Sequence, residues 1–234
     1  MVRPIAAFLT AALLLAGCGD PPPAPGAASS ESPGHPPQTG SYPGSPSIAP
    51  ASGAPVELSG WEATVYYTAV ESLHTDAATT VTGCPTIDCE QHRHQQTLGS
   101  FPASFVKAVK DEGTGRTADG RYLNWSYDTG YWMDSAPRDT AGRPLQPWSS
   151  AAADTGALRA GTRFTILRCG TAEVTAEVCA RLKAPTWTIV DEFTPGLGGS
   201  RHVDLYIGEE TGPDFTDSDL YTTLENATLS AIRA

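Results

Sequence analysis

The sequence predicts a mainly β domain that closes into a small barrel. Runs of β-branched and aromatic residues recur along the chain, as they do in strands. Glycine and proline punctuate the intervals, for example in "TPGLGG" and "GTGRTADG". Few segments have the spacing of an amphipathic helix. Many short strands with little helix favour a barrel over a parallel sheet with crossover helices.

Residues 1–17 predict a secretory signal peptide. Arg3 precedes the apolar run "PIAAFLTAALLLAG", which is short for a membrane-spanning helix. The run ends in "LAGC", which resembles the lipobox of bacterial lipoproteins, so we expect Cys18 to receive a lipid. An ordinary cleaved signal with an incidental Cys18 is the alternative. The lipoprotein interpretation predicts an exported chain, held at the outer face of the cytoplasmic membrane through its lipid only.

The sequence predicts a disordered tether at residues 18–55 and one folded domain at residues 56–234. The tether is rich in Pro, Gly, Ser and Ala, and it cannot bury enough apolar surface to offset the entropy of ordering. The remaining length suits a single domain. The whole chain has 26 acidic against 15 basic residues, which argues against nucleic acid as a partner.

The domain contains four cysteines in two local pairs. They are Cys84, Cys89, Cys169 and Cys179. In an exported protein, such pairs predict two disulfides. The alternative is a zinc site in which His92 and His94 join the first pair, because residues two apart face the same side of a strand. An oxidising compartment removes the thiolates that zinc needs, so we expect no metal and no other cofactor.

The main strands are predicted from four segments of the domain. They are "EATVYYTAV" (Glu62–Val70), "TRFTILRC" (Thr162–Cys169), "TWTIVD" (Thr186–Asp191) and "RHVDLYIG" (Arg201–Gly208). In the last segment Val203, Leu205 and Ile207 share one face, which is a natural core face. Asp204 alternates with these residues and therefore points out of the core, together with His202 and Tyr206. Asp191 ends an otherwise apolar face, where an aspartate commonly caps a turn.

One helix is predicted at "SFPASFVKAVKDEG", between Ser100 and Gly113. Ser100 is expected to cap it, Pro102 suits its first turn, and Gly113 is expected to end it. Glu112, just before that glycine, is interpreted equally well as a helix-end residue or as a site residue. A second helix is predicted near "DSDLYTTLENA", at residues 217–227.

Two segments resemble the 3D domain, which is named for three aspartates and is also present in the MltA family of lytic transglycosylases. They are "SAAADTGALRAGTRFTIL" and "WTIVDEFTPGLGGSRHVDLYIG". The matching block covers residues 149–208, and the three aspartates correspond to Asp154, Asp191 and Asp204. The RlpA and expansin barrels are near alternatives. Residues 68–148 have no clear counterpart in this pattern.

This resemblance implies a six-stranded double-psi β-barrel with one or two short helices and a long insertion. It also implies a groove that takes a cell-wall glycan such as peptidoglycan. Asp204 matches the catalytic position, where one aspartate protonates the leaving oxygen and then takes a proton from the C6 hydroxyl of the sugar. That role requires a raised pKa, and Asp191 and Asp154 are expected nearby to favour the protonated form.

The insertion contains the aromatic segment "YLNWSYDTGYWMD", which is interpreted as a wall of the groove. The candidate substrate-binding residues are Trp125, Tyr131, Trp132 and Tyr206, since ring faces pack well against sugars. A place in the core is the alternative for the two tryptophans. The sequence thus leaves two hypotheses: a peptidoglycan-cleaving lytic transglycosylase, or a non-catalytic wall-associated barrel that binds glycan or a protein.

Overall fold

The computed structural model describes residues 54–89 and 95–232. The signal peptide, Cys18, nearly all of the tether, and both His92 and His94 lie outside these ranges. The chain divides into two units, residues 1–47 and 48–234, and every described residue belongs to the second. No helix within the described ranges has the length and apolar character needed to cross a membrane.

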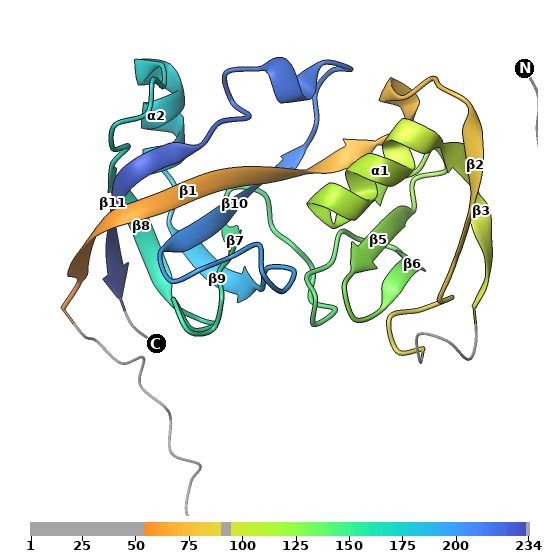
Figure 1. Cartoon of the computed structure of the whole chain (residues 1–234), viewed down its shortest axis with the longest axis horizontal. Helices are drawn as coiled ribbons and strands as arrows, with labels where there is room; N and C mark the ends of the chain where they lie inside the picture. Colours follow the sequence, from red (N-terminus) through yellow and green to blue (C-terminus); the bar gives the residue numbers. More distant parts are fainter. Residues whose placement is uncertain (1–53, 90–94, 233–234) are drawn as a thin grey trace, which may run out of the picture. The chain divides into compact units, whose positions relative to one another are not determined.

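Six strands form a closed barrel of mixed direction (Figure 1). Around the ring they are β1 (Val56–Val70), β10 (His202–Glu209), β7 (Ser150–Ala152), β9 (Trp187–Asp191), β8 (Arg163–Arg168) and β11 (Leu224–Ile232). The ring closes because β1 pairs with β11 on one side and with β10 on the other. The β1–β10 and β7–β9 pairs are parallel, and the other four are antiparallel. The predicted six-stranded barrel is confirmed.

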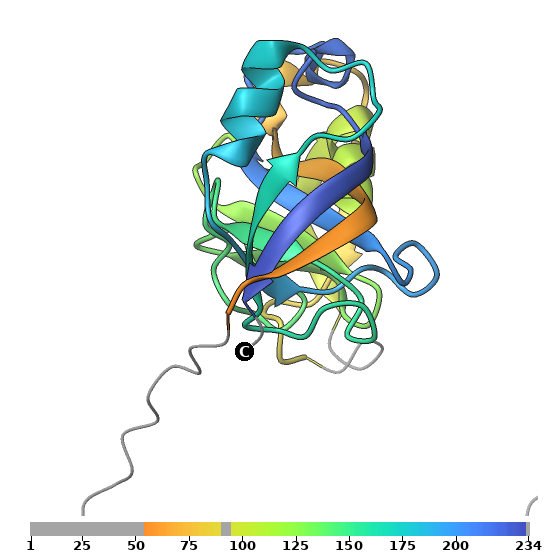
Figure 2. The same ribbon diagram turned by 90° about the vertical axis from the view of Figure 1, so that its left-hand side faces the viewer.

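The barrel interior is filled by alternate residues of its strands. Val203 and Leu205 of β10 are fully buried, and Ile207 is 5% exposed, so the predicted core face is confirmed. Phe164 and Ile166 of β8 enter the same core. In Figure 2, β1 (orange) and β11 (dark blue) cross the barrel side by side, as their pairing requires. On β1 and β10, the side chains that alternate with the core residues face outward from the barrel.

Between β1 and β7 the chain makes the long insertion that the sequence predicts. Its elements are the 3-10 turn η1 (Glu71–Leu73), β2 (Ala78–Gly83), β3 (Gln96–Pro102), α1 (Ala103–Glu112), β4 (Thr114–Arg116), β5 (Tyr122–Ser126) and β6 (Gly130–Asp134). The far end of β1 pairs in parallel with β4, which extends the sheet through β5 to β6. β2 and β3 form a separate hairpin. Strand β1 is therefore shared by the barrel and the insertion (Figure 1).

Helix α1 is close to the predicted helix but begins differently. Ser100 lies within β3 and does not cap it, and Pro102 is the residue before the first turn, with no side-chain cap. The predicted end is confirmed, since Gly113 adopts φ 88° and its N–H donates to the carbonyl of Val109. A left-handed residue at this position suits glycine, which has no Cβ to clash.

The second predicted helix, at residues 217–227, is wrong. That segment contains the end of the 3-10 turn η2 (Phe215–Asp217) and the start of β11. Leu224 and Ala227 pair with β1 instead, so sheet formation overrides the local preference. The second helix is α2 (Ala176–Lys183), whose N-terminus is capped by the Thr175 hydroxyl.

Both predicted disulfides are confirmed, Cys84–Cys89 and Cys169–Cys179. The second bond ties α2 to the residue that follows β8. Bonded sulfurs offer no thiolates, so the alternative zinc site lacks two of its four ligands. Two disulfides are typical of proteins that fold outside the cytoplasm.

Candidate active site

A cavity of about 220 Å³ lies between the barrel and the insertion. We call it the carboxyl cavity, because carboxylate side chains from both parts line it. The barrel strands contribute Thr64, Asp191 and Asp204, and the insertion contributes Glu112 and Trp125. The insertion therefore forms one wall of the cavity, as the sequence suggested.

Asp204 is placed in this cavity by the alternation of β10. Its neighbours Val203 and Leu205 fill the barrel, so the Asp204 side chain must leave through the opposite face. Thr64 is its partner across the parallel β1–β10 pair and donates a hydrogen bond to Asp204 Oδ1 at 2.8 Å. Burial raises the pKa of Asp204 to about 7, and the charge of Asp191 adds to this rise. Asp204 is thus a carboxyl that exchanges its proton near neutral pH.

Thr64 links Asp204 to His202. The Thr64 oxygen lies 2.9 Å from His202 Nε2, on the same face of β10 as Asp204. A hydroxyl has one proton, and the Thr64 hydroxyl donates it in a hydrogen bond to ionised Asp204. For Thr64 also to accept a hydrogen bond from His202, the His202 ring must carry a proton on Nε2. The ring of Phe193 packs on His202 with a centroid distance of 4.5 Å. These contacts fix the orientation of the Asp204 carboxyl.

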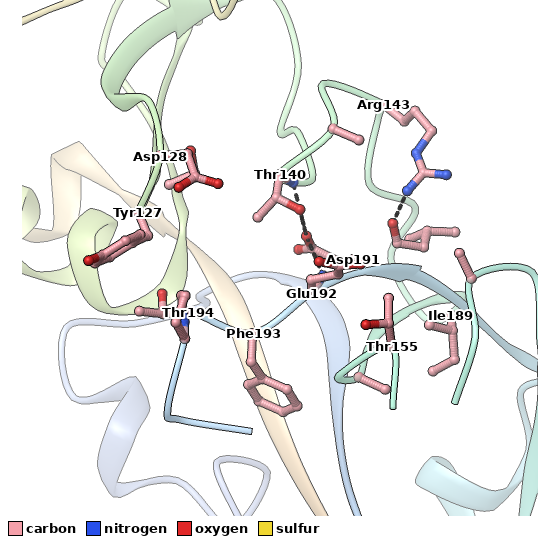
Figure 3. A pocket seen from close by; sticks show the side chains of 16 residues that line it. Tyr127, Asp128, Thr140, Arg143, Thr155, Ile189, Asp191, Glu192, Phe193 and Thr194 are labelled. Atoms are coloured by element: carbon pink, nitrogen blue, oxygen red, sulfur yellow. Dashed lines mark hydrogen bonds between the residues drawn. The ribbon is translucent and has the colours of Figure 1, made fainter. Parts of the chain in front are cut away.

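Asp191 ends β9, as predicted, and lies beside the same cavity. Its Oδ1 accepts hydrogen bonds from the N–H and the hydroxyl of Thr140, at 2.9 and 3.0 Å (Figure 3). The N–H of Glu192 donates to the same oxygen. Burial raises the pKa of Asp191 to about 6 despite these hydrogen bonds. Asp191 therefore combines a turn-capping role with an electrostatic effect on Asp204.

A second cavity, of about 310 Å³, continues on the other side of Asp191. Both cavities are lined by Ser126, Thr140, Asp191, Glu192, Phe193 and Thr194. Figure 3 shows this second cavity, with Tyr127 and Asp128 lying across from Phe193 and Asp191. The shared lining makes the two cavities neighbouring parts of one groove.

Glu112 is another carboxyl that lines the carboxyl cavity. It is the last residue of α1, and it accepts hydrogen bonds from the Tyr67 N–H at 3.3 Å and from the Tyr221 hydroxyl at 3.0 Å. Burial, and then the charge of Asp204, raises the pKa of Glu112 to about 8. Glu112 therefore ends the helix and also lines the cavity.

Asp154 does not line the carboxyl cavity, so the expected cluster of three aspartates is not formed. Its Oδ2 instead accepts a hydrogen bond from the Gly199 N–H at 2.7 Å, in the turn between β9 and β10. A Cβ on Gly198 would clash with the Asp154 carboxylate, so a larger residue there would have to displace this carboxylate. Asp154 anchors the glycine-rich turn rather than acting on the proton of Asp204.

Of the four aromatic residues proposed to bind substrate, Trp125 lines the carboxyl cavity. Trp132 is fully buried and Tyr206 is 1% exposed, so both belong to the interior and offer no surface to a sugar. The Tyr206 hydroxyl lies 2.6 Å from that of Thr68. Tyr131 donates its hydroxyl proton to the Val106 carbonyl and lies outside the cavity lining. The core interpretation holds for Trp132, whereas Trp125 is partly buried, packs against the core and also lines the cavity.

Sequence reasoning missed Thr64 and left His202 without a role. The alternation of β10 places His202 beside Asp204 on one face, which is a usable signal. Thr64 is identified only through the register of the parallel β1–β10 pair, which joins positions far apart in the sequence. Within residues 54–89 and 95–232, no group of three or more His, Cys, Asp or Glu side chains is arranged to hold a metal ion.

The arrangement suits proton transfer to and from a ligand in the groove. Burial raises the pKa values of Asp191, Asp204 and Glu112 to about 6, 7 and 8, so these carboxyls keep their protons to higher pH than exposed carboxyls do. Near neutral pH the cavity therefore holds both an ionised and a protonated carboxyl. Such pairs serve as base and acid in enzymes.

No protein-family model and no curated protein matches the sequence. Solved structures do align with this chain at low identity. Escherichia coli MltA with bound chitohexaose is 11% identical over 76% of this chain and 72% of its own, with a TM-score of 0.46. A membrane-bound lytic murein transglycosylase from Agrobacterium tumefaciens is 11% identical over 77% of each chain, with a TM-score of 0.45. The lytic transglycosylase LtgG of Burkholderia pseudomallei is 14% identical over 76% and 74%, with a TM-score of 0.39. The chain is thus similar in fold, at low identity, to the MltA lytic transglycosylases.

Proposed function

We propose that this protein cleaves a cell-envelope glycan, as a peptidoglycan lytic transglycosylase in which Asp204 is the catalytic acid and base. One observation carries the proposal: Asp204 lies in a cavity with a pKa of about 7. An exposed aspartate has a pKa of about 4 and is therefore ionised at neutral pH. Asp204 instead retains its proton to near neutral pH, as a general acid must.

In the proposed reaction, protonated Asp204 gives its proton to the glycosidic oxygen as the bond from that oxygen to C1 breaks. The C6 hydroxyl oxygen of the same sugar attacks C1, and its proton passes to the Asp204 carboxylate. The products are a 1,6-anhydro sugar and a chain with a new free hydroxyl. No water is added, and Asp204 ends the cycle in its starting state.

The groove around Asp204 supports a polymeric substrate. The neighbouring cavity extends the binding region beyond Asp191, so more than one sugar has room to bind. Trp125 presents its ring at the wall of the carboxyl cavity, and Lys110 Nζ lies over that ring, 6.0 Å from its centroid. Partly apolar sugar faces pack well on such rings.

Incubation of purified peptidoglycan with the protein, followed by mass analysis of the fragments, tests the proposal. We expect fragments ending in anhydro sugars from the parent, and a rate at least ~10²–10⁴-fold lower from Asp204→Asn. Asp154→Asn is the matched control, because it makes the same chemical change outside the cavity, and it should keep most of the activity. Glycan binding without any cleavage by the parent would instead identify the barrel as a binding module.

We also propose that the protein is a lipoprotein, with residues 56–234 held on the tether 18–55. The disulfides support a location outside the cytoplasm, and the "LAGC" pattern supports the anchor. Cys18→Ser should abolish labelling with a lipid precursor and move the protein from the membrane to the soluble fraction. Unchanged retention in the membrane would contradict the anchor.

A further inference from the structure

We propose that Glu112 is a second catalytic carboxyl, which donates the proton to the leaving oxygen while Asp204 acts as the base. This inference rests on the proposed glycan cleavage and changes one part of it: Glu112, in place of Asp204, supplies the proton to the leaving oxygen, and Asp204 keeps the role of the base. It concerns a residue of the insertion, outside the segments that resemble the 3D domain. The observations that carry it are the placement of Glu112, its hydrogen bonds and its charge environment.

Glu112 and Asp204 reach the carboxyl cavity from different parts of the fold. Asp204 comes from the barrel strand β10, and Glu112 comes from the C-terminal end of α1 in the insertion. Both line the same cavity, together with Trp125. A sugar chain bound in this cavity would therefore meet a carboxyl from the barrel and another from the insertion. Most glycosidases cleave with two carboxyl groups arranged around the bond.

The Glu112 carboxyl is held in place by β1. The β1–β10 pairing is irregular between Tyr66 and Thr68, because these residues pair with positions three apart on β10. The Tyr67 N–H lies at this irregularity and donates to Glu112 Oε2, while the Tyr221 hydroxyl contacts Oε1. Both oxygens are thus oriented, as is required of a group that transfers a proton in a fixed direction.

The surroundings of Glu112 favour its neutral form. No lysine, arginine or histidine in the described residues forms a salt bridge with it. The groups that act on its pKa are the carboxylates of Asp204 and Asp111, which raise it, and the hydrogen bonds from Tyr67 and Tyr221, which lower it less than burial raises it. The charge of Asp204 raises the pKa of Glu112, so when Asp204 is ionised in the same cavity, Glu112 is favoured to stay protonated.

The step is balanced as follows. The bond between C1 and the glycosidic oxygen breaks, and that oxygen takes the proton of Glu112. The C6 hydroxyl oxygen bonds to C1, and its proton moves to Asp204. Glu112 ends as a carboxylate and Asp204 as an acid, so one proton must pass back through solvent before the next turnover.

Substrates with different leaving groups test this division of roles. Peptidoglycan needs an acid to protonate its leaving oxygen, whereas a 2,4-dinitrophenyl glycoside of a chito-oligosaccharide releases a stable phenolate without one. Glu112→Gln should slow peptidoglycan cleavage about 10²–10³-fold and leave cleavage of the dinitrophenyl glycoside within about threefold of the parent. Asp204→Asn should slow both. Tyr221→Phe keeps the Glu112 carboxyl and removes one of the two hydrogen bonds that orient it, so it should slow peptidoglycan cleavage by less than Glu112→Gln does.

Parental cleavage of peptidoglycan by Glu112→Gln would overturn the role of Glu112 and leave the proposed function standing. Equal losses on both substrates would show a structural role and would also overturn it. A parent that cleaves no glycan overturns both proposals. A carbon-13 NMR titration of the parent, labelled at the glutamate carboxyls, gives a test without any variant. One glutamate should titrate near pH 8. If no glutamate titrates above about pH 6, the inference is contradicted.

Discussion

Replacing Asp204 with asparagine should stabilise the protein at alkaline pH while removing its activity. The pKa of Asp204 is raised from 3.8 to about 7, so the folded protein binds its proton more tightly than the unfolded chain does. The stability associated with this group is complete below about pH 4, declines as pH rises to about 7, and is constant above that. At pH 8 the parent therefore holds a carboxylate in an unfavourable site, and Asp204→Asn removes that cost.

The size of the effect follows from the pKa shift. A shift of about three units corresponds to roughly 4 kcal/mol, and water entering the cavity reduces this, so we expect a gain of roughly 2–4 kcal/mol at pH 8. At pH 4 both side chains are neutral, and asparagine keeps an oxygen that accepts the Thr64 hydroxyl, so the difference should be under about 1 kcal/mol.

Urea unfolding of parent and variant at pH 4 and pH 8, with the disulfides intact, measures both differences. The pH 4 pair serves as the internal control for any change in packing. The reasoning is refuted if the variant differs from the parent by the same amount at both pH values, because burial would then not penalise the ionised form of Asp204.

Three further predictions concern other parts of the site and the fold. Asp191→Asn removes a negative charge beside Asp204, the carboxyl proposed to be catalytic, so the limb of the pH–rate profile that reports Asp204 should move to lower pH by less than about one unit; an unmoved profile contradicts the coupling. Trp125→Ala should raise KM for the glycan about tenfold. Trp132 is in the core, so Trp132→Ala should instead lower the free energy of unfolding by about 3–5 kcal/mol. Equal effects of the two substitutions on glycan binding would refute the placement of Trp125 in the cavity and Trp132 in the core. Cys169→Ser combined with Cys179→Ser should lower stability by roughly 2–3 kcal/mol in urea unfolding, and an unchanged midpoint would show that the bond does not constrain the unfolded chain.

Features that depend on short-range patterns could be predicted from the sequence. The alternation of "RHVDLYIG" is enough to turn Val203 and Leu205 inward and Asp204 outward, since successive residues of a strand face opposite sides. Cysteines only a few residues apart find each other whatever the fold, so both disulfides follow from spacing in an oxidising compartment. Gly113 ends α1 because it alone tolerates the left-handed backbone of the helix end.

Only the tertiary structure decided which carboxyls share a cavity. Asp154 and Asp191 looked equivalent in the sequence, but the glycine-rich turn folds back onto Asp154 and draws it away from Asp204. Glu112 joins Asp204 because β1 runs through both the barrel and the insertion and holds α1 against the cavity. Such contacts depend on strand register and on packing between distant segments, and no local period in the sequence encodes either one.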